Sequence, residues 1–319
     1  MSDLGIPQRF VDLAEQMGRQ ALSEAGLHER FGEPADVEIE VGQVWRARWE
    51  EVTSLLLVLA VEGREVHAAP VTIDPPAEDE HSLVVDDVAT AFGVETTVWA
   101  GLDSRMPIRV LDRLIDVWND DLVQWTEDAV QDRFNLVPAG ARRGGEIRSE
   151  LHPTALLRAE LADDLEWLRQ APGLPVEVAG AAQRNLASLL GANVDLKSLC
   201  SALGLSQPEV MSLLRGQFPV TQEQVGVIAR VTGLPGEDVA DTTIPRFPLG
   251  LAMTIEHPRW RSTWTQRAQR MGVSEAEART SGGYGVFSMA ARETGSDGPN
   301  WDERLRQFLA GEEVGKDGA

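Results

Sequence analysis

Residues 195–234 read DLKSLCSALGLSQPEVMSLLRGQFPVTQEQVGVIARVTGL, and this stretch decides the fold of the C-terminal half of the chain. Apolar residues recur in it at helical spacing on both sides of Gly204, which predicts two short helices over 196–203 and 207–214. An aspartate and a serine stand just before these helices, and their side chains can cap a helix N-terminus. The glycine supplies the turn between the two helices.

A further helix is predicted over 222–232, because Thr221 and Gln224 form a capping box and Gly233 follows as a stop signal. Two short helices joined at a glycine, with the N-terminus of the second one exposed, form the arrangement that enters the major groove of DNA. Over about sixty residues, 180–240, the helix order and lengths resemble the helix-turn-helix domain of the Xre/lambda-repressor-like family. The segments LCSALGLSQPEVMSLLRG and VTQEQVGVIARVTGL carry this resemblance in register.

The resemblance implies a set of DNA-contacting residues. It places Gln207 at a frequent base-contacting position, where an amide can pair with adenine, and it places Met211 and Ser212 on the outward face of the same helix. Arg215 and Lys197 are the expected phosphate contacts. Residues 181–240 hold only four basic side chains, however, so the alternative is a helical interaction module that does not bind DNA.

The N-terminal half is rich in short apolar runs separated by small polar turns, which suggests a compact barrel rather than alternating strands and helices. The expected strands are 41–49, 55–61, 66–72, 83–85, 96–100 and 107–111. The segments GQVWRARW, SLLLVLAVEGREVHAAPVT and PIRVLDRLID resemble the SH3-type barrel of the PemK/MazF-like family.

Family members of this kind are ribonucleases, which use an arginine near the start of the second strand and a hydroxyl after the third. Thr72 occupies the second of these places, but Ser54 stands where the family has its arginine. Loss of the guanidinium removes the main electrostatic stabilisation of the transition state, so we expect no catalytic residues and no enzyme. Arg46 and Arg48 are the residues that could replace the missing group if they shared a groove with Thr72.

These patterns predict an α+β protein in which a small SH3-like β-barrel domain precedes an all-α helix-turn-helix region and C-terminal helices. We expect an N-terminal helix (1–36), the barrel domain (37–130), a linker and helix (131–175), the helix-turn-helix domain (176–242) and a C-terminal helical region (243–319).

Three local expectations follow from spacing and from glycine content. Apolar residues from position 112 onward recur at helical spacing and are expected on one helix face: Leu114, Ile115, Trp118, Leu122 and Trp125. The Pro- and Gly-containing stretch 137–147 is expected to be a linker, and the GGYG segment at 282–285 a flexible turn. A helix over 150–170 should turn one set of leucines inward: Leu156, Leu157, Leu161, Leu165 and Leu168.

The net charge of −22 is distributed unevenly. Residues 1–130 hold nine arginines against 27 acidic residues, whereas residues 257–309 hold eight arginines against six acids. If nucleic acid is bound, the charge distribution favours the C-terminal half, and a protein partner is expected on the acidic N-terminal domain. In the C-terminal segment we expect Trp260, Trp264 and Met271 to be core residues. We expect its arginines either to contact phosphates or to be solvated or paired with acids of the N-terminal domain.

Several classes of function lack support in the sequence. Apolar runs are too short for a membrane span, and we find neither a signal-peptide pattern nor motifs for a metal, nucleotide or other cofactor. The single cysteine, Cys200, fits a reducing cytoplasm. His67 is expected to be structural, and His152 and His257, each followed by proline at a helix start, are expected to cap a helix or to pack.

The leading hypothesis is a cytoplasmic bacterial transcriptional regulator of Xre type that binds duplex operator DNA as a homodimer. It would be the regulatory or antitoxin-like member of a toxin–antitoxin or defence locus. The alternatives are a protein-interaction scaffold without DNA binding and a degenerate MazF-like endoribonuclease.

Overall fold

The computed structural model describes residues 24–32, 37–73, 77–131, 133, 136–147, 152–177, 186–191, 195–214, 220, 222–243, 246–290 and 300–314. The part of the expected N-terminal helix before residue 24 lies outside these ranges. The chain divides into two compact units: Met1–Pro172 with His257–Ser262, and Gly173–Glu256 with Thr263–Ala319. The protein is α+β, with its sheet in the first unit and mainly helices in the second.

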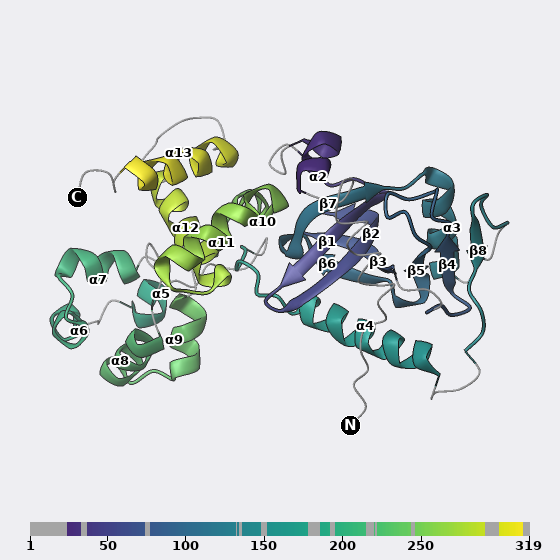
Figure 1. Ribbon diagram of the computed structural model, residues 1–319. Helices are drawn as coiled ribbons and strands as arrows, with labels where there is room; N and C mark the ends of the chain where they lie inside the picture. The colour runs from purple at the N-terminus through teal and green to yellow at the C-terminus, as the bar shows by residue number, and fades with distance from the viewer. Residues whose placement is uncertain are drawn as a thin grey trace, which may run out of the picture. The chain divides into compact units, whose positions relative to one another are not determined.

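The first unit is built on one antiparallel sheet, visible in blue and purple in Figure 1. Its strands are β1 (Gln43–Trp49), β2 (Val52–Glu62), β3 (Glu65–Thr72), β4 (Ser82–Val85), β5 (Thr96–Trp99), β6 (Ser104–Pro107), β7 (Leu111–Val117) and β8 (Ala141–Arg143). Their order is β7-β1-β2-β3-β5-β4-β8, and β6 pairs with β3 beside β5. The five strands expected between positions 41 and 100 are therefore confirmed.

The sheet does not close on itself. Among the described strands, β7 pairs only with β1 and β8 pairs only with β4, so the path from β7 to β8 is open. A small closed barrel is therefore not confirmed. Alternate residues of β2 and β3 point into one apolar core, among them Leu57, Leu59, Ala69 and Val71. Residues of β4, β5 and the helix α3 (Asp120–Val130) belong to the same core.

Residues 111–117 form a strand, so the expectation of a helix from position 112 was wrong. The segment LDRLIDV pairs with β1 and is buried along most of its length. A near-continuous run of buried residues has no period of two, so its sequence cannot be distinguished from that of a buried helix. Its buried Asp116 accepts hydrogen bonds from the Arg30 guanidinium at 2.8 Å and from the Ala91 N–H at 2.8 Å. The helix α3 (Asp120–Val130) begins only after Asn119, whose side chain accepts from the Leu122 N–H.

Two other segments differ from the sequence-based expectation. The expected linker 137–147 contains β8, which adds to the edge of the sheet through its pairing with β4. The expected strand 107–111 is instead the end of β6, the short 3-10 helix η3 (Ile108–Val110) and the start of β7. A further 3-10 helix, η2 (Ala100–Leu102), follows β5.

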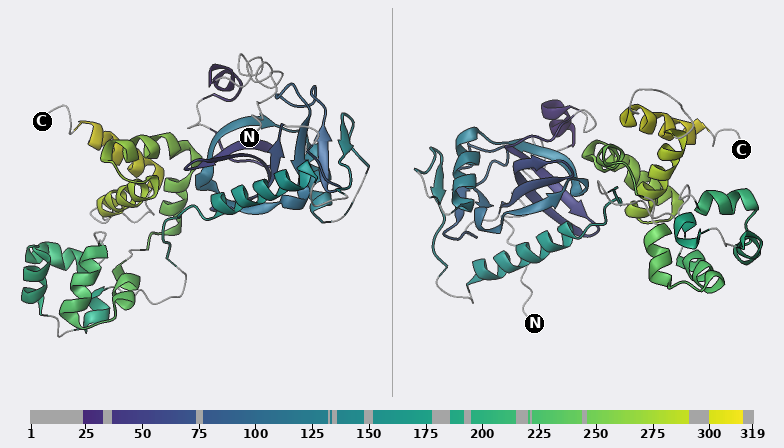
Figure 2. Two further views of the ribbon diagram at one scale, coloured as in Figure 1. Left: turned by 60° about the horizontal axis from the view of Figure 1, so that its bottom comes forward. Right: turned by 180° about the vertical axis from the view of Figure 1, so that it is seen from behind.

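The helix α4 (Pro153–Arg169) lies along one side of the sheet, as Figures 1 and 2 show, and contacts β1, β2 and β6. His152 caps it by accepting from the Thr154 N–H, as expected. Leu161, Leu165 and Leu168 are buried against the sheet, whereas Leu156 is 61% exposed, so its predicted inward orientation was wrong. The small helix α2 (Glu24–Phe31) packs beside β7.

The second unit consists mainly of short helices. They are α5 (Leu186–Leu190), α6 (Leu196–Leu203), α7 (Gln207–Leu214), α8 (Gln222–Thr232), α9 (Gly236–Thr243), α10 (Leu249–Glu256), α11 (Arg261–Met271), α12 (Glu275–Ala290) and α13 (Trp301–Val314). The first two residues of α11 belong to the first unit, as does the 3-10 helix η5 (Pro258–Trp260), which His257 caps as expected.

The GGYG segment lies inside α12, so the expectation of a flexible turn was wrong. A Cβ on Gly282 would lie 2.5 Å from the ring of Trp264, and one on Gly285 would overlap the ring of Phe308. The glycines are thus needed for close packing between helices rather than for a turn. Trp264 is fully buried as expected, but Met271 is 48% exposed and is not a core residue.

Candidate nucleic-acid interface

The helices α5 to α9 form a small bundle with its own core, drawn in green and teal in Figure 1. The core residues are Leu186, Leu199, Val210, Leu213, Leu214, Val225, Ile228 and Val239. Each of the five helices contributes at least one of them, so the apolar spacing seen in the sequence is the spacing of the buried face.

The predicted boundaries of α6 are confirmed by its caps. The Asp195 carboxylate accepts hydrogen bonds from the backbone N–H of Lys197 at 3.1 Å and of Ser198 at 3.2 Å. These bonds, together with one from the Ser198 hydroxyl, lower the pKa of Asp195. At the other end Gly204 has φ of +67°, a conformation that residues with a Cβ rarely adopt.

The N-terminus of α7 is fixed by two hydrogen bonds that Ser206 donates to Glu209. The Ser206 carbonyl accepts the first helical hydrogen bond from Val210, which places Ser206 at the N-cap as expected. The Glu209 carboxylate accepts from the Ser206 N–H at 2.7 Å and from its hydroxyl at 2.6 Å, and these bonds lower the pKa of Glu209. The charge of Glu209 is therefore held at the helix N-terminus by two bonds.

The predicted DNA contacts lie on α6 and α7 with different exposures. Gln207 and Lys197 are exposed, whereas Met211 is half-buried and packs against the core of the bundle. Ser212 lies in α7, but its side chain is outside the described residues, as is the whole of Arg215. Gln207 is thus an exposed polar side chain in the first turn of α7.

The acids of the bundle are placed where they stabilise helices. Glu209, Glu223 and Glu237 each lie in the first turn of their helix, α7, α8 and α9 respectively. A carboxylate there interacts favourably with the helix dipole. The near-neutral charge of this region therefore arises in part from helix-stabilising acids.

The features expected of a ribonuclease site are arranged unfavourably in the sheet. The Thr72 hydroxyl accepts a hydrogen bond from Trp99 Nε1 at 3.0 Å, and Ser54 is buried. The register pairs Arg46 with Leu55 and Leu55 with Val71, so Arg46 and Arg48 lie on the sheet face opposite to Ser54 and Thr72. Arg46 is also bound to Asp112 at 2.8 Å. The arginines therefore do not replace the missing guanidinium.

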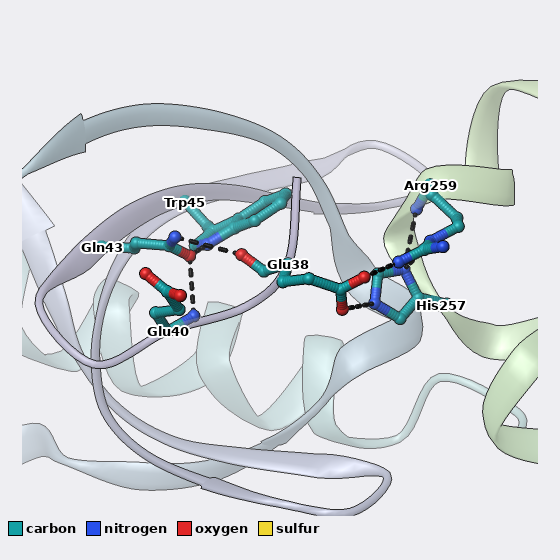
Figure 3. Close-up of polar contacts among 6 residues, drawn as sticks. All are labelled: Glu38, Glu40, Gln43, Trp45, His257 and Arg259. Atoms are coloured by element: carbon teal, nitrogen blue, oxygen red, sulfur yellow. Dashed lines mark hydrogen bonds and ion pairs between the residues drawn. The ribbon is translucent and has the colours of Figure 1, made fainter. Parts of the chain in front are cut away.

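Figure 3 shows a polar network of the first unit that the sequence did not indicate. Buried Gln43 holds the segment before β1, because its amide accepts from Trp45 Nε1 and from the Glu40 N–H and donates to the Glu38 carbonyl at 3.0 Å. The Glu38 carboxylate then binds His257, with 3.3 Å between Oε2 and Nε2.

The same carboxylate binds Arg259, whose Nε also donates to His257 Nδ1 at 3.2 Å. Because Nδ1 accepts, Nε2 carries the proton that faces Glu38. Arg261 is buried, donates to the Val110 carbonyl and lies over the ring of Trp49. Two of the C-terminal arginines therefore anchor the 257–262 segment in the first unit.

His67 and Asp103 form a further polar pair of the first unit, with 2.5 Å between His67 Nε2 and Asp103 Oδ2. Among the described residues no group of His, Cys, Asp and Glu side chains is arranged to hold a metal ion, and no described helix is long and apolar enough to cross a membrane.

The chain matches no protein-family model and no curated protein in sequence.

Proposed function

We propose that this protein is a DNA-binding transcriptional regulator of Xre type. The observation that carries the proposal is the pair of helices α6 and α7. The two helices are capped at their N-termini and joined through Gly204 in the left-handed conformation, and the second helix begins with the exposed Gln207. That arrangement allows the N-terminus of α7 to enter a major groove while α6 crosses the backbone.

The protein would act in the bacterial cytoplasm as the regulatory or antitoxin-like member of a toxin–antitoxin or defence locus. Its sheet domain would be a PemK/MazF-like fold reused for binding a protein partner, without a catalytic step. It would bind operator DNA as a homodimer, since one unit with few basic residues contacts too little backbone and two units read two half-sites.

The first test replaces the proposed base contact. Gln207→Ala is expected to cost about 1–3 kcal/mol at the preferred site, because an adenine loses a bidentate partner. Lys197→Ala and Arg215→Ala are expected to weaken binding to all sequences alike, since they contact phosphate. Fluorescence anisotropy with preferred and scrambled duplexes from the gene's own promoter region measures both effects.

The matched control is Gln266→Ala, which removes an exposed glutamine from α11 and should leave both affinities unchanged. If Gln207→Ala and Gln266→Ala behave alike on a duplex that the wild type prefers, Gln207 does not read a base. If the wild type binds neither duplex, the scaffold alternative is favoured.

A further inference from the structure

The outer face of α4 combines apolar and acidic side chains. Leu156 is 61% exposed and Trp167 is 50% exposed, and the two residues are eleven positions apart, which places them on the same side of the helix. Exposed Glu160 and Asp163 lie between them on that side, opposite to the leucines that pack on the sheet. A large exposed indole on a helix that is otherwise well packed is typical of an interaction surface.

The negative charge of this face is not compensated within the described residues. Glu160 and Asp163 form no ion pair there, whereas the two arginines of the helix are engaged, Arg158 with Asp79 and Arg169 with Glu166. Burial, followed by the charges of Glu160 and Asp163, raises the pKa of the neighbouring Asp164. A cation placed over this face would relieve the repulsion between the carboxylates.

The C-terminal end of α11 has the complementary composition. Arg270 is exposed and forms no ion pair with the described residues, and Met271 and Val273 next to it are 48% and 37% exposed. Burial, followed by the charge of Arg270, lowers the pKa of Arg267. Gly272 ends the helix at φ of +66° and presents this short segment at its tip.

We propose that the α4 face of one copy of the chain binds the Arg270–Val273 tip of a second copy. Arg270 would lie against Glu160 and Asp163 and over the ring of Trp167, while Met271 and Val273 cover the apolar side chains. Made reciprocally about a two-fold axis, this contact would occur twice in a dimer. The proposal rests on the self-association proposed above and not on DNA binding.

The test is a charge exchange in the full chain, followed by sedimentation equilibrium over a range of concentrations without DNA. Asp163→Arg and Arg270→Asp are each expected to raise the dimer dissociation constant on the order of tenfold, and the combined variant is expected to restore it. Trp167→Ala should weaken the dimer at least as much, because exposed aromatic anchors dominate small interfaces. Asp87→Arg is the matched control, since Asp87 is exposed elsewhere in the first unit.

The outcomes separate this surface from the proposals on which it rests. A wild-type chain that stays monomeric at all concentrations overturns both the surface and self-association. If the single charge reversals leave the dimer dissociation constant unchanged, or if the double variant does not restore it, the proposed surface is wrong and self-association still stands. Because no DNA is present, neither result depends on operator binding.

Discussion

Leu199→Ala is expected to lower the free energy of unfolding of the α5–α9 bundle by about 2–5 kcal/mol. Leu199 is 1% exposed and is the buried residue that α6 contributes to the core of this small bundle. Removing the methine and two methyl carbons of the leucine loses their burial and leaves a cavity that so small a core cannot easily close. Urea unfolding followed by far-UV circular dichroism, which reports the helical second unit most strongly, measures the loss.

The control is the same substitution at Leu249 in α10, which lies in the same unit but is 53% exposed. Leu249→Ala should change the free energy of unfolding by less than about 0.5 kcal/mol. Equal effects of the two substitutions would mean that α6 does not pack as described. The position of α7, which packs against the same core, would then be wrong as well.

Gly144→Ala is expected to destabilise the first unit by about 1–3 kcal/mol or more. A Cβ at this position would overlap the Asp79 carbonyl oxygen and the Ser82 hydroxyl oxygen, two atoms that hydrogen bond to each other at 2.8 Å. The Gly144 N–H also donates to the Ser82 carbonyl at 2.9 Å, so the backbone cannot move away without losing that bond. Near-UV circular dichroism of the tryptophan-rich sheet unit during urea unfolding detects the change.

The neighbouring glycine supplies the control. A Cβ on Gly145 would meet only the end of the Glu78 side chain, at 3.8 Å, so Gly145→Ala is expected to be nearly neutral. If Gly144→Ala is as stable as Gly145→Ala, the corner formed by β8 and the loop before β4 is not as described.

The parts of the fold that could be predicted from the sequence are those fixed by local interactions. The bounds of α6 and α7 follow from Asp195, Gly204 and Ser206, because caps and a left-handed glycine act within a few residues. The strands β2 and β3 were recognisable for a similar reason, since a two-residue turn at Gly63 separates two apolar runs.

The errors arose where distant packing decides the structure. The segment 111–117 is a strand because it pairs with β1, more than sixty residues earlier, and its buried run has no period that distinguishes strand from helix. The glycines of α12 indicate a turn when only local propensity is considered, yet they are required by Trp264 and Phe308 on other helices.

The candidate sites were predictable to different degrees. Gln207 and Lys197 could be placed from the helix-turn-helix pattern, and both are exposed. The contact of Glu38 with Arg259 joins residues 221 positions apart, and no local pattern pairs them. The exposed position of Trp167 could have been inferred from its helical spacing to Leu156, but only once the opposite face of α4 was known to be the buried one.

The central claim is that the α6–α7 pair binds operator DNA, and the most direct test is the salt dependence of binding to the gene's own promoter region. The wild-type chain is expected to bind this duplex with a logarithm of affinity that falls linearly with the logarithm of salt concentration between about 50 and 200 mM. Gln207→Ala should keep that slope and lose the preference for the site, since the side chain contacts a base and not a phosphate. Absence of binding at the lowest salt, or binding with no salt dependence and no sequence preference, would contradict the account.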